Sequence, residues 1–299
     1  MRKFVGIACI LSIVIALIAF AIYNDQTCVQ PLYYNDINLF AHVVDGVSND
    51  ENRDSLTNVS AYHKQIVKDI FEDLSEVYNF DKPLPNIGYY HTNNIAKAQY
   101  FDGCIYIDFS DNDINSIRAS IAHELIHYFT DDDNLGFDYT LDNVLLLGHS
   151  LTEGITNYFS TKYAANDNYL YETHVAKLLA ICYGEDALKD DFFYSVDVTN
   201  LRKDFNKELK KYYHNTVYNS RTFMPFDVMT LTLNSFTEYV NKGIRNEHDM
   251  LLIEEMMLFY AYTKGCEDLV VEEIMSFAKE YDEKQFAMLI QQQAKLTGR

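Results

Sequence analysis

Residues 115–130 read NSIRASIAHELIHYFT and contain the segment His123-Glu124-Leu125-Ile126-His127, which decides the fold. The spacing of the apolar residues predicts a helix, and positions i and i+4 of a helix lie on the same face. We therefore expect His123 and His127 to bind one metal ion together. Glu124 lies one step around the helix, where it can polarise a metal-bound water without serving as a ligand.

The two faces of this helix differ in chemistry. At about 100° per residue, one side carries only apolar residues and is expected to pack against the core. The opposite side carries the two histidines with Ser116 and Ser120, which leaves room for a cleft. The alternative is a pair of solvated or hydrogen-bonded surface histidines beside an acid, but their orientation on the helix favours a metal site. The apolar side comprises Ile114, Ile117, Ile121, Leu125, Tyr128 and Phe129.

Glu153 is the best candidate for a further ligand, because a catalytic zinc ion usually keeps three protein ligands and one water. It lies in a second amphipathic segment, residues 151–159, and shares one side of it with Asn157. Asn157 could hydrogen-bond an imidazole N–H and fix the orientation of that ring. The competing interpretation is a capping box, in which Glu153 would bond to the backbone of Ser150. The histidines upstream favour the ligand.

Together these motifs resemble the gluzincin zinc metallopeptidases, and the bacterial peptidase MA-like group more than thermolysin. The resemblance rests on the H-E-x-x-H segment, on Leu151-Thr152-Glu153-Gly154 downstream and on Tyr158, and it covers about residues 85–165. It implies one Zn²⁺ ion bound by His123, His127 and Glu153, with a zinc-bound water activated by Glu124. The implied activity is zinc-dependent, extracytoplasmic hydrolysis of peptide bonds in a peptide or protein substrate.

The resemblance also implies an edge strand that aligns the bound peptide by β-augmentation. Four residues are candidates for stabilising the tetrahedral intermediate, namely Tyr158, His149, Tyr183 and His214. Asn157 is a candidate for supporting the metal ligands through a hydrogen bond. The implied edge strand consists of Cys104, Ile105, Tyr106, Ile107, Asp108 and Phe109.

Several other functions are weighed against this one. A non-catalytic, metalloprotease-like binding or sensing domain outside the cytoplasm is the main alternative. A metzincin site ending at Asp133 is disfavoured because Thr130 stands where its turn needs glycine. Residues 131–133 are all aspartate and could bind calcium, although a solvated loop is the simpler interpretation.

No C-x-x-C pair exists, and four scattered cysteines outside the N-terminal apolar run predict no particular disulfide.

Residues 4–23 form an uncharged apolar run after Arg2 and Lys3, which is long enough to span a bilayer. We expect the chain to be exported, and anchored in the membrane by this helix or secreted if a signal peptide is cleaved. A net charge of −20 disfavours nucleic acid as a partner. The hydropathy patterns predict an α+β fold with a small sheet and the H-E-x-x-H helix, followed by a mainly helical subdomain. The resemblance implies that the sheet and this helix form a zincin-like catalytic core. The expected divisions are residues 1–24 (transmembrane anchor or signal peptide), 25–58 (stalk), 59–112 (small α/β subdomain), 113–165 (metal-binding helices) and 166–299 (helical subdomain).

Overall fold

The computed structural model of the 299-residue chain describes most of the sequence from residue 60 to residue 280, and all of these residues belong to one compact unit, residues 50–299. The expected membrane segment, the expected stalk and the three aspartates at 131–133 lie outside the described residues. None of the described helices has the length and hydropathy that a membrane span requires. The described residues are 60–89, 97–101, 103–108, 113–130, 139–141, 145–164, 169–195, 199–213, 216–218, 221–242, 244 and 247–280.

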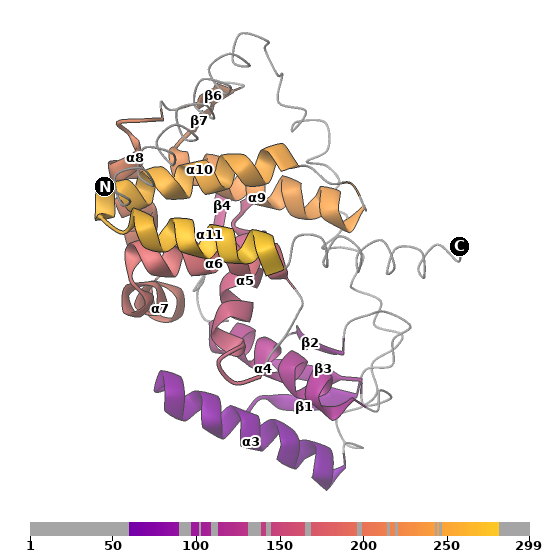
Figure 1. Ribbon diagram of the computed structural model, residues 1–299. Helices are drawn as coiled ribbons and strands as arrows, with labels where there is room; N and C mark the ends of the chain where they lie inside the picture. The colour runs from indigo at the N-terminus through magenta and orange to yellow at the C-terminus, as the bar shows by residue number, and fades with distance from the viewer. Residues whose placement is uncertain are drawn as a thin grey trace, which may run out of the picture. The chain divides into compact units, whose positions relative to one another are not determined.

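The described part of the chain is mostly helical with a small three-stranded sheet, which confirms the α+β class (Figure 1). A helix and the sheet come first, the motif helix follows, and helices dominate the remainder. The elements are α3 (Ala61–Tyr78), β1 (Asn86–Tyr89), β2 (Ala98–Phe101), β3 (Cys104–Ile107), α4 (Ile114–Thr130), β4 (Tyr139–Leu141), β5 (Leu145–Leu147), α5 (His149–Ser160), α6 (Leu170–Tyr183), α7 (Glu185–Tyr194), α8 (Thr199–Leu209), β6 (Thr216–Tyr218), β7 (Arg221–Phe223), α9 (Pro225–Asn241), α10 (Glu247–Lys264) and α11 (Glu267–Glu280).

The sheet has the strand order β1-β3-β2, so β3 is its central strand. β3 pairs in parallel with β1 and antiparallel with β2. The expectation that residues 104–109 form the edge strand is therefore wrong. Cys104, Ile105 and Ile107 are all buried, and a short run of apolar residues on both faces is typical of a strand with neighbours on both sides. Within the described sheet β2 is an edge strand, and the sequence did not predict it.

Helix α4 is buried on nearly all sides. The expected core side is confirmed for Ile117, Ile121, Leu125 and Phe129, which are at most 2 % exposed, but not for Ile114 at the start of the helix, which is 37 % exposed. The histidine side is covered too, and His123 is only 3 % exposed. Helix α3 and strands β2 and β3 pack against α4, and α5 packs against it as well. The histidines therefore face a site between helices rather than the surface.

Helices α5 and α6 approach each other very closely at Gly154. A Cβ atom at this position would lie 2.2 Å from the backbone carbonyl oxygen of Glu172, which is closer than non-bonded atoms can approach. Only glycine fits this crossing without moving one of the helices. Because Gly154 directly follows Glu153, the close contact also sets how the first turn of α6 lies over the predicted ligand.

We predict that Gly154→Ala destabilises the protein. In an open helix this change would be favourable by about 1 kcal/mol, because alanine has the higher helix propensity. Here the added methyl group must displace the backbone of α6, which we expect to lower the free energy of unfolding by about 1–3 kcal/mol. Urea denaturation followed by circular dichroism measures the difference. An unchanged or increased free energy of unfolding would contradict the close approach of α5 and α6.

Candidate metal centre

Three side chains from two helices converge on one point. Helix α4 supplies His123 and His127, and α5 supplies Glu153. The Nε2 atoms of the two histidines lie 3.2 Å apart. Glu153 places Oε2 at 3.1 Å from His123 Nε2 and Oε1 at 3.5 Å from His127 Nε2. The structure thus brings together the three residues that the sequence predicts as ligands.

The spacing of these atoms fits a metal ion with tetrahedral coordination. With bonds of about 2.0–2.1 Å, two ligand atoms of a tetrahedral zinc site lie about 3.3 Å apart. The observed separations of 3.1, 3.2 and 3.5 Å bracket this value. The Nδ1 atom of His123 is buried and has no hydrogen-bond partner among the described residues, so its Nε2 atom carries the polar interactions of the ring.

Glu153 does not act as a helix cap. Helix α5 begins at His149 after Gly148, which occupies the N-cap position with φ 85°. Ser150 is therefore inside the helix, and its backbone N–H donates to the side chain of Asn234. The capping-box interpretation is wrong because the helix begins two residues earlier than that motif requires. The carboxylate is free of the backbone and lies with the histidines.

The charges around Glu153 favour its ionised form. Burial alone would raise the pKa of its carboxyl, but the charges and hydrogen bonds of His127 and His123 outweigh burial and hold the pKa well below its ordinary value. A metal cation at the same point would act in the same direction, since an opposite charge favours the carboxylate. Glu153 is thus in the protonation state that a ligand needs.

Glu124 lies beside this group without joining it. Its Oε2 atom accepts a hydrogen bond of 2.7 Å from the backbone N–H of Tyr100 on β2. Burial raises the pKa of Glu124, and the charge of Glu153 raises it further, while the two histidines and the Tyr100 N–H lower it. The carboxylate is close enough to the ligands to feel their charges and is fixed by the edge strand of the described sheet.

Tyr169 covers the ligands from the start of α6, and no sequence pattern predicted this position. Its ring stacks on the imidazole of His123, with centroids 5.2 Å apart and planes at 10°. Its hydroxyl donates to Glu153, and the charge of Glu153, with burial and the charge of Glu124, raises the pKa of Tyr169 well above its ordinary value. The hydroxyl therefore keeps its proton and can only act as a donor near this point.

The backbone of Tyr169 is also unusual. It has φ 54° and ψ 39°, a left-handed conformation that bulky residues rarely adopt. Such strain persists when the surrounding structure enforces it, and it is common at functional sites. The run of asparagine and aspartate at 166–168 predicts a turn before α6, but nothing in it indicates that the following tyrosine covers another helix.

Three of the other candidate residues have hydrogen-bond partners away from the ligands, and His149 is the exposed first residue of α5. Tyr158 donates from its hydroxyl to Glu185 on α7 at 2.8 Å. Asn157 is fully buried and donates to Thr173 at 2.8 Å, which joins α5 to α6. Tyr183 donates to Asp191 at 2.9 Å, and His214 lies outside the described residues. These contacts place Asn157 and the two tyrosines in the packing of the helical half.

Comparison with known proteins finds no matching family model, no matching curated protein and no matching solved structure. The residues and distances of the site therefore carry the functional proposal on their own. What the structure shows is a buried group of two histidines and one glutamate that could hold a metal ion.

We predict one bound metal ion per chain, held by all three side chains. Elemental analysis of the full-length protein in detergent should give a stoichiometry near one. His123→Ala and Glu153→Ala should each lose most of the metal, because two remaining ligands bind far more weakly than three. Glu185→Ala, an exposed glutamate on α7, is the matched control and should keep the metal. Full occupancy in Glu153→Ala, with the fold intact by circular dichroism, would remove Glu153 from the ligand set.

Proposed function

We propose that this protein is a zinc-dependent peptidase of the gluzincin type. The observation that carries the proposal is the position of Glu124, whose carboxylate lies beside the ligand group and not within it. A purely structural metal site has no need for an acid in this place, and it usually closes its fourth position with another side chain. A group of three ligands with an adjacent carboxylate is the arrangement that hydrolysis needs.

The donor chemistry favours zinc. Two imidazole nitrogens and one carboxylate form a ligand set that catalytic zinc commonly uses, whereas calcium and magnesium prefer oxygen ligands alone. A bound zinc ion would polarise the scissile carbonyl and lower the pKa of a water molecule. His123, His127 and Glu153 would hold the ion, and the buried setting of His123 and Glu153 would limit the entry of further solvent.

Glu124 is the proposed general base. It takes the proton from the attacking water and passes it to the nitrogen of the leaving amine. Burial raises its pKa toward the range in which a carboxylate both accepts and returns a proton readily. The hydrogen bond from Tyr100 N–H keeps one carboxylate oxygen in place, which orients the other.

The substrate-aligning strand is proposed to be β2 and not β3. The N–H of Tyr100 bonds to Glu124, so this side of β2 points away from β3 and toward the site. An extended peptide can add to such an edge through backbone hydrogen bonds and then lies along the sheet. This orientation would place its scissile carbonyl near the ligand group.

Tyr169 is the proposed donor to the oxyanion that forms on the scissile carbonyl. Its hydroxyl is protonated and lies at Glu153, and the residue as a whole is 38 % exposed, so Tyr169 lies at the border between the buried ligands and solvent. A donor fixed beside the developing charge stabilises the transition state more than the ground state. The stacking on His123 holds the ring in place.

The second candidate function is a non-catalytic binding or sensing domain that keeps a metalloprotease-like scaffold. The tight packing around α4 is the observation in its favour, because His123 is almost fully buried. In both proposals the site lies outside the cytoplasm, with the N-terminal apolar run as anchor or signal. The two functions differ in the metal coordination that they require. A peptidase needs one open position on the metal for water and substrate, whereas a binding domain does not.

We predict that Glu124→Gln abolishes most turnover while leaving the metal in place. Glutamine keeps the shape and can still accept from Tyr100 N–H, but it cannot take a proton. We expect kcat on a fluorogenic peptide library to fall by about 10²–10⁴-fold, the usual contribution of a general base. Glu185→Gln should behave like the parent. Parental turnover in Glu124→Gln would disprove the mechanism.

A hydroxamate that chelates zinc distinguishes the peptidase from the binding domain. A site with an open position should bind it, and the protein should gain thermal stability by mass action. A closed site should ignore it or lose its metal and become less stable. A metal-loaded protein that neither binds the hydroxamate nor cleaves a library peptide would support the binding domain.

We predict that Tyr169→Phe lowers kcat with little change in KM or in metal content. Phenylalanine keeps the ring stacked on His123 and removes only the hydroxyl. Loss of one oxyanion donor typically costs about 10²–10³-fold in kcat. Tyr158→Phe, whose hydroxyl contacts Glu185, should retain activity. If Tyr169→Phe instead loses metal affinity in parallel with activity, the hydroxyl positions Glu153 and does not contact the substrate.

A further inference from the structure

Two cysteine thiols meet where the end of α6 lies against the turn between α10 and α11. Cys182 is in the last turn of α6, and Cys266 lies between the two later helices. The two thiols lie within interaction distance of each other, and neither is part of a disulfide in this structure. The pair joins positions 84 residues apart in the sequence.

The backbone of α10 fixes both sulfur atoms. Cys182 Sγ lies 3.9 Å from the carbonyl oxygen of Met257, and Cys266 Sγ lies 3.8 Å from that of Ala261. These carbonyls are one helical turn apart on the same side of α10. Contact with the same side of α10 therefore brings the two sulfurs close together.

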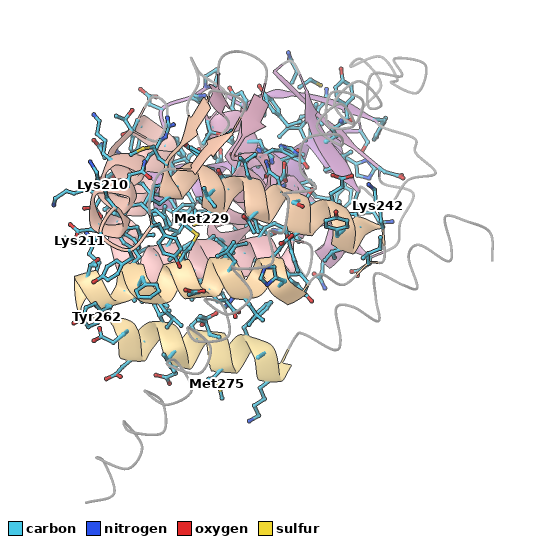
Figure 2. All side chains as sticks on the ribbon, turned by 90° about the horizontal axis from the view of Figure 1, so that it is seen from above. Lys210, Lys211, Met229, Lys242, Tyr262 and Met275 are labelled. Carbon is cyan, nitrogen blue, oxygen red and sulfur yellow. The ribbon has the colours of Figure 1, made fainter. Side chains whose placement is uncertain are left out.

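The turn that carries Cys266 is well defined. Gly265 has φ 70°, the left-handed conformation that ends many helices, and the N–H of Cys266 donates to Ala261 O at 3.1 Å. Figure 2 shows Tyr262 at the end of α10, with α11 running alongside. Residue 266 thus has a fixed place against α6.

We propose that Cys182 and Cys266 are a disulfide-forming pair that links the end of α6 covalently to the α10–α11 turn. An exported protein meets oxidising conditions in which such bonds persist. The proposal does not depend on the peptidase activity or on the metal. It selects one pairing among the cysteines, which the sequence alone could not do.

The chemistry needs a disulfide-bearing oxidant, with oxidised glutathione as the probe. Cys182 is buried and Cys266 is partly exposed, so Cys266 is the thiol that an oxidant reaches first. Its thiolate attacks the oxidant, forms a mixed disulfide and releases one glutathione thiol. Cys182 then attacks the sulfur of Cys266 and releases the second. Two thiols lose two electrons and two protons, and one oxidised glutathione becomes two reduced molecules.

Burial makes the second step slow. It raises the pKa of the Cys182 thiol, and the neighbouring Cys266 raises it further, so little thiolate is present at neutral pH. The two S–H contacts to carbonyls are lost on oxidation, but thiols are weak donors and the carbonyls belong to a helix that remains intact. Loss of these two contacts therefore opposes formation of the bond only weakly.

The test uses full-length protein in detergent, folded and treated with oxidised glutathione, then alkylated, digested and mapped by mass spectrometry. We expect a linked peptide containing Cys182 and Cys266 and the loss of two titratable thiols. The closed loop is long, so the melting temperature should rise by about 5–15 °C relative to the reduced protein. Cys182→Ala and Cys266→Ala should each lose the linked peptide and the shift, whereas Cys104→Ala should keep both.

The peptide map of the unmutated protein decides the outcome even if a variant fails to fold. Recovery of both cysteines as free thiols after complete equilibration would overturn the proposal. So would a stable glutathione adduct on Cys266 with Cys182 still free, or a bond from either residue to a different cysteine.

Discussion

The close contact between Gly154 and the Glu172 carbonyl is the constraint on which the site depends. Because residue 154 has no side chain, α5 and α6 approach closely, and the first turn of α6 lies against α5, the helix that carries Glu153. Tyr169, just before that turn, then stacks on His123 and bonds to Glu153. A larger residue at 154 would separate the helices and lift the tyrosine from the ligands, with no change to any ligand itself.

The electrostatics of the site follow from crowding three carboxylates into one buried region. Burial raises the pKa of Glu124 and of Glu172, and the charge of Glu153 adds to both effects. Glu172 also accepts a hydrogen bond of 2.8 Å from Thr237 on α9, which lowers its pKa in turn. Glu153 alone has its pKa lowered, because it faces the histidines. The negative charge that a bound cation would neutralise is therefore concentrated on Glu153.

Sequence patterns predicted the elements that bear the ligands but not how the rest is arranged around them. The i, i+4 spacing placed His123 and His127 correctly, since helix geometry is local. Glu153 was predicted as a ligand because the two upstream histidines outweighed its competing role in a capping box. The structure excludes that role, since the helix begins two residues earlier than the capping box requires. Strand order and the position of Tyr169 depend on contacts between distant segments, which hydropathy periods do not encode. The hydrophobic run of β3 did carry a signal for a central strand, but the resemblance assigned it to the edge.

The sequence separations within the site have a consequence for the order of folding. The Tyr100–Glu124 and His123–Glu153 contacts span 24 and 30 residues, whereas the Tyr78–Phe159 hydrogen bond spans 81. Loop closure costs more entropy as the loop lengthens, and distant contacts slow folding. The ligand group can therefore assemble while α3 is still undocked, so a metal ion that binds at this stage would act as a folding nucleus, and its concentration would then control the rate of folding as well as the final stability.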